Sequence, residues 1–434
     1  MRLSGEGYIF GCAGTVALPD NENYYLVAGF LNSNIASFIL KLLNPTLNFV
    51  VANITSLPLT SLENSDLIGA YSKRLEEISK EDWDNYEISW DFSSSPLLKA
   101  STGGIQTLRD VYQKYVDNSK VLIDEYKRLE CEINRIFLKA YELSESNLTP
   151  YTDRKITLKI NPYYRYSTSL VDAAVLSRYQ SDIVVELTSY SIGCMMGRYS
   201  LDKLGLILAS QGENLEDYLG QIPSPRFFPD EDAILPITDE EWFPDDATNR
   251  FREFVRVVWG DDLLDENLTF VAESLCLYAI KPKKGESSLE TIRRYLSTQF
   301  YKDHMRTYKK RPIYWLFSSG KHKAFECLVY LHRYNEGTLS RMRMEYVVPL
   351  QSRYQARIED LDNSLAGDVT TSDRKRLQKE QDQLRKKLDE LRRFDEQLRH
   401  YADQRIQLDL DDGVKVNYGK FGDLLAEVKA ITGK

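Results

Sequence analysis

The most informative part of the sequence for the fold runs from Tyr301 to Tyr346 and reads YKDHMRTYKKRPIYWLFSSGKHKAFECLVYLHRYNEGTLSRMRMEY. It interleaves cations with aromatic rings, in a chain whose formal net charge is -9. Clustered Lys and Arg beside aromatic residues are typical of a surface that binds a phosphate backbone. The cations of the stretch are Lys302, Arg306, Lys309, Lys310, Arg311, Lys321, Lys323, Arg333, Arg341 and Arg343.

The same stretch also fits a purely structural interpretation. Ile313, Trp315, Phe317, Phe325 and Leu328 could form a core that the cations only solvate, and the sequence leaves both interpretations open. A strand or turn built on the apolar run would hold the neighbouring cations on a rigid base. Six of them are therefore candidate contacts to DNA backbone phosphates: Lys309, Lys310, Arg311, Lys321, Lys323 and Arg333.

Downstream of this stretch, leucine-rich heptads predict a helical hairpin of coiled-coil type over residues 351–400. Apolar residues recur at heptad spacing on both sides of a polar turn at residues 367–371, and so short a turn makes the two helices antiparallel. Basic and acidic residues alternate on the second helix, which favours a solvated face over a DNA contact. Around Asp412-Gly413 the alternation of apolar residues predicts a β-hairpin, and an amphipathic helix follows it.

Upstream, helical periodicity dominates. It predicts one long helix over residues 105–142, while Ile156, Leu158 and Ile160 alternate as a strand does. Prolines and acids between Pro223 and Asp246 predict a surface loop system. The predicted fold class is α+β, predominantly helical. The predicted segments are 1–64, an N-terminal segment; 65–150, a helical spacer; 151–350, a mixed α/β domain with the basic-aromatic segment; 351–400, the helical hairpin; and 401–434, the β-hairpin with the terminal helix.

Composition places the chain in a reducing compartment. Its 434 residues are 42% hydrophobic, so they can bury sizeable cores. The five cysteines are odd in number and form no C-x-x-C pair, which argues against a disulfide framework or a zinc module. Neither a signal-peptide pattern nor an apolar run of about 18 residues occurs. We therefore expect a cytoplasmic protein with no membrane partner.

Tests for catalytic chemistry give mostly negative results. The four histidines lack metal-ligand spacing, and the chain has no P-loop and no nucleophile elbow. Asn161-Pro162-Tyr163-Tyr164 is similar to the Asn-Pro-Pro-Tyr loop with which amino-group DNA methyltransferases hold a flipped base. Tyr163 replaces the second proline there, and a turn that ends a strand is the default interpretation. We predict no catalytic, cofactor-binding or metal-ligating residue in this chain.

Several long motifs nevertheless carry a family resemblance. They are Asn161 to Tyr166, Ser191 to Ser200, Asp239 to Phe243, Asp246 to Arg250, Lys310 to Ser319 and the tail from Leu398 to Lys434. Together they resemble the C-terminal portion of PglX, the adenine-specific DNA methyltransferase family of type 1 BREX phage-defence systems. The resemblance covers nearly the whole chain.

The resemblance implies a division of labour. Family members carry a methyltransferase domain, with its S-adenosylmethionine loop, ahead of the matched portion. We expect that domain to be absent here. The chain should therefore have no cofactor of its own and should be inactive alone. Residues 8–60 look like part of the target-recognition region of such enzymes, so the resemblance implies that segment 1–64 belongs to that region. Amide and hydroxyl side chains can read base edges, which makes Asn32, Ser33, Asn44 and Asn48 the base-reading candidates.

Two functions from different classes stay open. The first is the DNA-recognition and assembly half of an adenine-N6 methyltransferase that marks self DNA, with double-stranded DNA and the upstream methyltransferase domain as partners. The second is a non-catalytic interaction protein, a truncated product that binds other BREX proteins or a phage-encoded DNA-mimic inhibitor. A complete minimal methyltransferase built on Asn161-Pro162-Tyr163-Tyr164 is the remote third.

Overall fold

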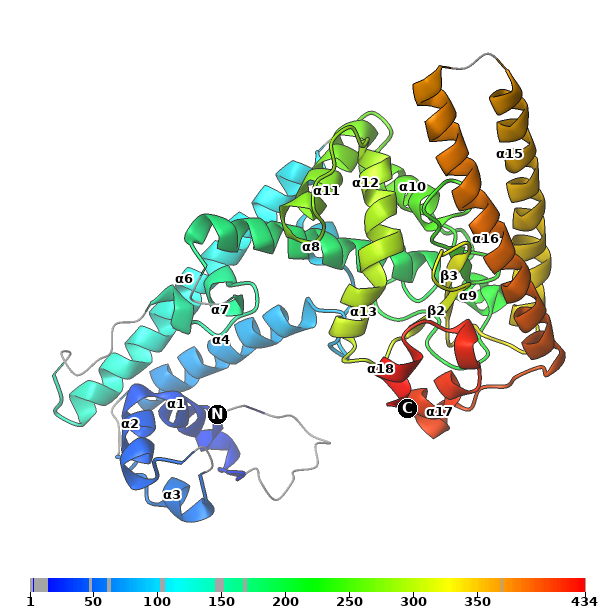
Figure 1. Ribbon diagram of the computed structural model, residues 1–434. Coiled ribbons are helices and arrows are strands. Elements are labelled where there is room, and N and C mark those ends of the chain that lie inside the picture. The colour runs from blue at the N-terminus through cyan, green and yellow to red at the C-terminus, as the bar shows by residue number, and fades with distance from the viewer. Residues whose placement is uncertain are drawn as a thin grey trace. The chain divides into compact units, whose positions relative to one another are not determined.

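The structure is a computed structural model that describes residue 3 and residues 15–46, 49–60, 64–101, 106–144, 152–166, 170–367 and 370–433 (Figure 1). Most of these residues are helical, and a single small antiparallel sheet accompanies the helices. This confirms a predominantly helical α+β fold. The chain forms two compact units, residues 1–89 with 112–176 and residues 90–111 with 177–434.

The first unit is all helical in its described part. Its core joins Phe30 of α1 to Phe137 of α6, whose ring centroids lie 5.3 Å apart. Gly29 lets α1 approach α4 closely, because a Cβ there would lie 2.5 Å from Ser72 Oγ. The elements are η1 (Asn21–Asn23), α1 (Tyr24–Asn32), α2 (Asn34–Leu43), α3 (Val51–Thr55), α4 (Ser65–Asp84), η3 (Asp153–Lys155), α7 (Pro162–Arg165) and most of α6 (Leu108–Ala140). The long helix predicted over 105–142 is thus confirmed as α6.

The strand predicted at residues 156–160 does not form. Ile156, Leu158 and Ile160 are buried as the alternation predicts, but the segment pairs with no strand in the described structure. Its main chain is held instead by the buried Asp82 carboxylate, which accepts hydrogen bonds from Lys159 N at 2.7 Å and Ile160 N at 2.8 Å. A side chain therefore supplies the acceptors that a neighbouring strand would supply.

The second unit packs helices around the sheet. Before the sheet stand α5 (Pro96–Ala100), α8 (Asp172–Met195) and α9 (Leu215–Gln221). Between its first and second strands lie α10 (Ala247–Trp259), α11 (Leu264–Tyr278), α12 (Ser288–Tyr295), the π-helical turn η4 (Leu296–Phe300) and α13 (Tyr301–Thr307). After the sheet come α14 (Thr338–Arg341), η5 (Met342–Val347), α15 (Val348–Ala366), α16 (Thr371–Asp403), η6 (Leu410–Asp412), α17 (Gly413–Gly419), η7 (Gly422–Leu424) and α18 (Val428–Thr432). A capping box of Ser287 and Glu290 begins α12.

The sheet contains β1 (Ile234–Pro236), β2 (Tyr314–Ser318) and β3 (Glu326–Tyr330) in the antiparallel order β1-β3-β2. Trp315 of β2 faces Val329 of β3, and both are buried. The free edge of β2 meets the segment after η7, where Phe317 bridges Leu425 and Ala426 N donates to Leu316 O at 2.9 Å. The apolar run that the sequence singled out is therefore the central hydrophobic element of this unit.

The helical hairpin is confirmed as an antiparallel pair, α15 and α16, which lie side by side in Figure 1. Ion pairs join Arg343 of η5, which directly precedes α15, to Asp395 at 2.7 Å and Arg357 to Glu380 at 2.7 Å, so residue numbers rise along one partner as they fall along the other. Tyr354 and Leu388 are buried at the predicted heptad positions. Supercoiling of the coiled-coil type stays a prediction.

Two predictions for this unit are wrong. The β-hairpin around Asp412-Gly413 is instead η6 followed by α17, because the buried Asn417 amide takes the main-chain groups of Asp409 that a partner strand would have used: Asn417 Oδ1 accepts from Asp409 N at 3.1 Å, and Nδ2 donates to Asp409 O. Residues 223–246 are not a surface loop system throughout. They contribute β1 and bury Phe227 and Phe243.

No single helix of the described chain is long and apolar enough to cross a membrane; residues 21–32 and 34–43 meet that criterion only as a pair bent by 67°.

Candidate nucleic-acid interface

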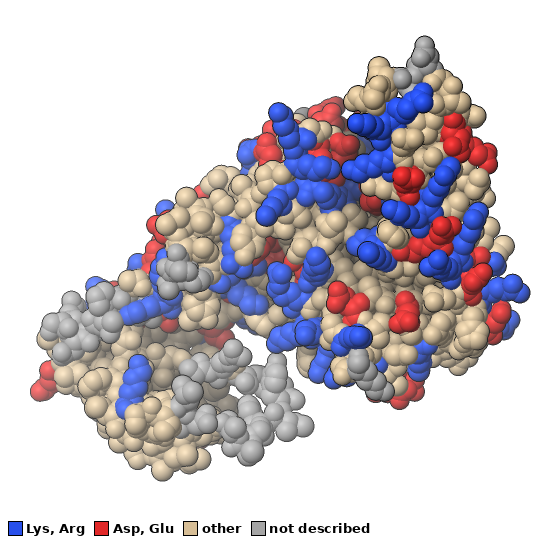
Figure 2. Space-filling view, in the orientation of Figure 1, with Lys and Arg blue, Asp and Glu red and all other residues tan. Residues whose placement is uncertain are grey.

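A group of exposed cations lies on α13 and the turn that follows it. Lys302 and Arg306 are four residues apart on the exposed side of this helix, and the turn adds Lys309, Lys310 and Arg311. We call these five residues the α13 basic face. Figure 2 shows basic side chains gathered over α13, whereas basic and acidic side chains are mixed along α15 and α16.

The turn after α13 has an unusual backbone. Lys309 and Lys310 have φ angles of 50° and 61°, in the left-handed region that normally favours glycine. Lys310 N donates to Met305 O at 2.8 Å and Arg311 N to Tyr308 O at 2.9 Å, which ends the helix and closes the turn. Two consecutive lysines therefore occupy positions where glycine would fit without strain.

These side chains are available to a ligand. Lys302, Lys309, Lys310 and Arg311 are exposed, and their side chains make no hydrogen bond or ion pair with any residue in the described part of the chain. Arg306 pairs with Asp303 at 3.2 Å, yet its side chain stays 73% exposed. Four of the five cations of the α13 basic face, all but Arg306, therefore present positive charge to solvent without an ion pair in the described chain.

Lys321 and Lys323 lie at the other end of β2, in the turn that leads to β3. A strand of five residues spans about 15 Å, so the predicted phosphate contacts do not form one cluster. Lys321 is exposed, whereas Lys323 Nζ donates to Ser297 O at 2.9 Å and to Glu326 Oε2 at 2.8 Å. The turn itself is held by Glu390 of α16, as described below.

Glu390 binds the β2–β3 turn at three points. Its carboxylate accepts hydrogen bonds from Ser319 Oγ at 2.8 Å, His322 N at 2.7 Å and Ala324 N at 3.2 Å. The helical hairpin thus fixes the loop that carries Lys321 and Lys323.

Arg333 belongs to the interior and not to the surface. It is 6% exposed, and its guanidinium donates to the main-chain oxygens of Asp230 and Glu231, each at 2.7 Å. The carboxylates of Asp230 and Asp232 add negative charge nearby, and burial raises the pKa of Asp230 well above its usual range. This placement argues against Arg333 as a DNA contact.

The aromatic residues of the stretch form core and not a stacking platform. Trp315, Phe317, Phe325 and Leu328 are fully buried, and Ile313 is partly so. Other rings of the stretch are buried as well: Tyr301, Tyr314 and Tyr330. The structure therefore supports the core interpretation for the apolar positions, while the exposed cations beside them still call for an explanation.

The base-reading candidates of the first unit have mixed placements. Ser33 is buried and caps α2, accepting a hydrogen bond from Ala36 N at 3.2 Å. Asn44 is partly buried and contacts Asn53 and Thr46. Asn32 is exposed at the end of α1, and Asn48 lies outside the described residues. Ser33 thus has a structural role that its sequence context did not reveal.

Asn161-Pro162-Tyr163-Tyr164 begins the short helix α7. Asn161 is fully buried; its Oδ1 accepts from Tyr163 N at 3.1 Å, and its Nδ2 donates to the main-chain oxygens of Asp153 at 2.6 Å and Ile156 at 3.0 Å. Both ends of the amide are used within the chain, which supports the interpretation of this motif as a local turn.

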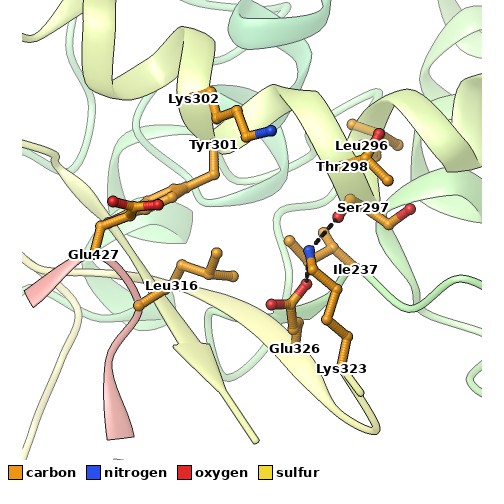
Figure 3. A pocket seen from close by; sticks show the side chains of 11 residues that line it. Ile237, Leu296, Ser297, Thr298, Tyr301, Lys302, Leu316, Lys323, Glu326 and Glu427 are labelled. Atoms are coloured by element: carbon orange, nitrogen blue, oxygen red, sulfur yellow. Dashed lines mark hydrogen bonds and ion pairs between the residues drawn. The ribbon is translucent and has the colours of Figure 1, made fainter. Parts of the chain in front are cut away.

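A cavity of about 460 Å³ has both Lys302 and Lys323 in its wall. Its wall includes Leu316 of β2, Tyr301 of α13 and Glu427, which lies beside the Tyr301 ring in Figure 3. The figure shows Lys323 Nζ between the carboxylate of Glu326 and the main chain at Ser297. The cavity lies between the α13 basic face and the β2–β3 turn, and Lys302, Lys323, Glu326 and Glu427 all line it.

Two histidines of this unit are neutral at physiological pH. Burial first and the charge of Arg198 second lower the pKa of His304 to about 3, and the same two causes lower the pKa of His332 to about 4. Nε2 of His304 accepts from Ile313 N at 3.1 Å and Tyr314 N at 3.2 Å, so its proton is on Nδ1. Arg198 and His304 stand 106 positions apart, and no spacing in the sequence could have predicted their proximity.

The described residues contain no group of three or more His, Cys, Asp or Glu side chains that could hold a metal ion. Of the cysteines in the described ranges, Cys194 and Cys327 are buried, and Cys131 and Cys276 are partly buried.

Two curated proteins that are similar to the chain over nearly all its length are both adenine-specific methyltransferases. One is BrxX of Escherichia coli O9:H4 strain HS, 50% identical over 437 residues, which span 100% of this chain and 35% of that protein. The other is PglX of Lacticaseibacillus casei strain Zhang, 34% identical over 425 residues, which span 96% of this chain and 33% of that protein. No family model matches the chain.

These matches confirm the resemblance that the motifs indicated. The chain is related along its length to a portion of the PglX family of adenine-specific methyltransferases, and it spans about a third of the length of the relatives it matches. A match of that extent fits the C-terminal portion of such an enzyme.

Proposed function

We propose that the chain is the DNA-contacting and assembly portion of a site-specific adenine-N6 DNA methyltransferase of BREX anti-phage defence, which marks self DNA. The similarity to BrxX and PglX supports the enzyme class. The observation that carries the DNA contact is the α13 basic face, which holds exposed and uncompensated cations on a chain with net charge -9. Segregated cations on an acidic protein direct a polyanion to one place.

On this proposal the α13 basic face binds backbone phosphates and does not read bases. Each phosphate contact releases counterions and contributes about 0.9 to the slope of log affinity against log salt. Replacing Lys309, Lys310 and Arg311 together by Ala should therefore weaken binding equally on cognate and non-cognate duplexes. The slope should fall by up to about 3, measured by fluorescence anisotropy over a salt series.

A second triple variant on α16 provides the matched control. Lys379, Lys386 and Arg393 are exposed at heptad spacing, so their replacement by Ala removes the same net charge from the alternating face of α16. We expect this variant to keep nearly the parental slope. If both triple variants flatten the slope alike, binding depends on net charge alone; if neither does, other residues bind the phosphates. Either outcome would contradict a special role of the α13 basic face.

On this proposal, residues of the first unit recognise the DNA sequence. Asn32 is exposed, so Asn32→Ala should change the ratio of cognate to non-cognate affinity without changing the salt slope. Asn44→Ala should do so less, because Asn44 is tied to Asn53. If both variants keep the parental ratio of cognate to non-cognate affinity, other residues read the bases.

Methyl transfer itself requires the rest of the enzyme. We propose that S-adenosylmethionine binds the methyltransferase domain of the full-length protein and that this chain alone does not bind it. Calorimetric titration of the chain should show no saturable heat at micromolar cofactor. Long-read sequencing of DNA from cells with the intact gene should show N6-methyladenine at an asymmetric site, and its absence would count against the assignment.

A further inference from the structure

Arg198 is a cation without a counter-ion. It follows the C-terminal end of α8, where Gly197 has a φ of 75° and Arg198 N donates to Gly193 O at 2.8 Å. The side chain is partly buried, and its Nε donates to the hydroxyl of Tyr199 at 3.0 Å. No aspartate or glutamate in the described ranges forms an ion pair with it.

Aromatic and neutral groups surround this guanidinium. It lies 5.3 Å from the centroid of the Tyr199 ring, and within electrostatic range of Tyr308, Tyr314 and Tyr330. The His304 ring stacks on Tyr314 at 4.9 Å and lies 4.8 Å from Tyr308. Every charged or titratable neighbour of Arg198 that these contacts identify is therefore a phenol or a neutral imidazole.

His304 adds a hydrogen-bond donor that the protein leaves unused. The side chain is 3% exposed, and its Nδ1, which carries the proton, has no partner in the described structure. His332 Nδ1 is likewise buried without a partner. An unused buried N–H is uncommon and costs free energy, and an anionic oxygen beside a guanidinium would satisfy it.

Two other buried arginines of the same unit have compensating partners that Arg198 lacks. Arg293 pairs with the buried carboxylate of Asp246, and Arg333 donates to main-chain oxygens beside Asp230. Both are compensated from within the protein, whereas Arg198 is not. The Arg198 environment also touches the α13 basic face, because Tyr308 directly precedes Lys309 and accepts a hydrogen bond from Arg311 N.

We propose that Arg198 and the Nδ1–H of His304 form a binding site for one phosphate group. The guanidinium supplies charge and a planar fork of donors, and the imidazole supplies a neutral donor in the low-dielectric part of the site. The inference rests on the proposed function only in the source of the ligand, which is either a nucleic-acid backbone phosphate that continues from the α13 basic face or free inorganic phosphate.

The first test measures thermal stability with inorganic phosphate, against chloride at matched ionic strength. Phosphate at about ten times its dissociation constant should raise the melting temperature of the parent chain by about 2–4 °C. Arg198→Met should lose this rise while melting at the same or a higher temperature without phosphate, because a cation without a counter-ion is removed. A variant that keeps the full phosphate response would overturn the proposal.

Two further variants protect this test against misfolding. Arg198→Lys keeps the charge but not the fork of donors, so it should fold and should weaken phosphate binding about tenfold. Arg252→Met, at an exposed position of α10 outside the α13 basic face, should keep the phosphate response in full. Loss of the response in Arg252→Met to the same extent as in Arg198→Lys would show a general charge effect and would overturn the site.

Histidine spectroscopy locates the ligand. The chain contains only four histidines, so a sample labelled with 15N in histidine gives a ring spectrum of four residues. Phosphate should shift the ring resonances of His304 and His332 and leave those of His322 and His400 in place. Equal shifts in all four, or none in His304, would contradict the proposed position.

Duplex DNA separates the two phosphate sources. If Arg198→Met loses the phosphate response and also weakens DNA binding, the ligand is a backbone phosphate; if it binds DNA normally, the ligand is free phosphate. Failure of the proposed function looks different, since the triple variant at residues 309–311 would then keep its salt slope while Arg198→Met still lost its phosphate response.

Discussion

Single residues in left-handed conformations give the sharpest prediction. Replacing Lys309 or Lys310 by Gly should raise the free energy of unfolding by up to about 1 kcal/mol each, because glycine adopts a positive φ without the steric cost of a Cβ. The same changes should weaken DNA binding. Chemical denaturation and fluorescence anisotropy on one set of samples measure both effects.

Arg311 is the control for this pair. It lies in the same turn but not in the left-handed region, so Arg311→Gly should weaken DNA binding without stabilising the chain. If the Lys309 and Lys310 variants are stabilised but bind DNA as the parent does, the strained lysines have no role in the interface.

Asp82 predicts a dependence of stability on pH. Burial raises its pKa from 3.8 to about 6, so the unfolded chain loses this proton at lower pH than the folded chain does. The contribution of Asp82 to stability is therefore greatest below about pH 4, falls as the pH rises to about 6 and is constant above it. The free energy of unfolding should fall by about 3 kcal/mol over this range, because each unit of pKa difference corresponds to about 1.4 kcal/mol.

Asp82→Asn tests this sign. The amide cannot ionise, so the fall between pH 4 and 6 should be smaller by that amount in the variant. Its NH₂ group meets one of the main-chain N–H groups of Lys159 and Ile160, which should cost about 1–3 kcal/mol at low pH. Denaturation midpoints of the parent chain and of Asp82→Asn, measured from pH 4 to 7, test this prediction. Parallel curves of midpoint against pH for the two proteins would contradict it.

Residue types alone could not separate structural from functional polar groups. Arg333 and Lys310 look equivalent in the sequence, yet one donates to main-chain oxygens in the interior and the other is exposed. Ser33 and Asn32 are adjacent, yet only Ser33 caps a helix. The difference depends on partners far along the chain, such as Asp230 for Arg333, which local spacing does not contain.

At the scale of elements, Glu390 links the helical hairpin to the sheet. Glu390→Ala removes the acceptor for three groups of the β2–β3 turn, including the main-chain N–H of His322 and Ala324. We expect a loss of about 2–4 kcal/mol, since charged acceptors of N–H groups contribute about 1.5–3 kcal/mol each and the contributions overlap. Hydrogen exchange of residues 319–324 should accelerate, while exchange within α13 should not.

Glu396→Ala is a matched change on the same helix, at an exposed position. It should leave exchange in the β2–β3 turn unaltered. Similar acceleration in both variants would mean that α16 as a whole, and not Glu390, holds the turn.

Elements with long periodic patterns were predictable and short alternating ones were not. The heptads of α15 and α16 and the three-four pattern of α6 repeat over many turns, so the whole pattern outweighs any one contact. The alternations at residues 156–160 and 406–418 are short, and a single buried side chain, Asp82 or Asn417, redirects the main-chain hydrogen bonds there. Such competition between side chain and strand is invisible to periodicity.

At the scale of the whole molecule, the two compact units predict separable stability. Asp82→Ala leaves two main-chain N–H groups of the first unit unpaired, and Arg333→Met leaves main-chain oxygens of the second unit unpaired. Each variant should accelerate hydrogen exchange mainly within its own unit. Acceleration spread evenly over both units would show that they unfold as one.

The family could be predicted from long motifs, but the site could not. Those motifs relate the chain to a portion of longer adenine-specific methyltransferases, while the candidate interface arises from the packing of α13 against β2 and of Glu427 beside Tyr301. Arg198 and His304 come together only through the fold. Sequence reasoning therefore found the basic segment and missed the groups behind it.

The path of the chain between the two units has a consequence for its synthesis on the ribosome. Residues 90–111 belong to the second unit, yet residues 112–176, which complete the first unit, emerge directly after them. Until residue 177 and its successors leave the exit tunnel, Phe92, Leu97 and Leu108 lack the partners that bury them. The nascent chain must carry this apolar segment unprotected for some sixty-five codons, about 3–13 s at bacterial translation rates, and a chaperone that binds extended apolar peptides has that interval in which to act.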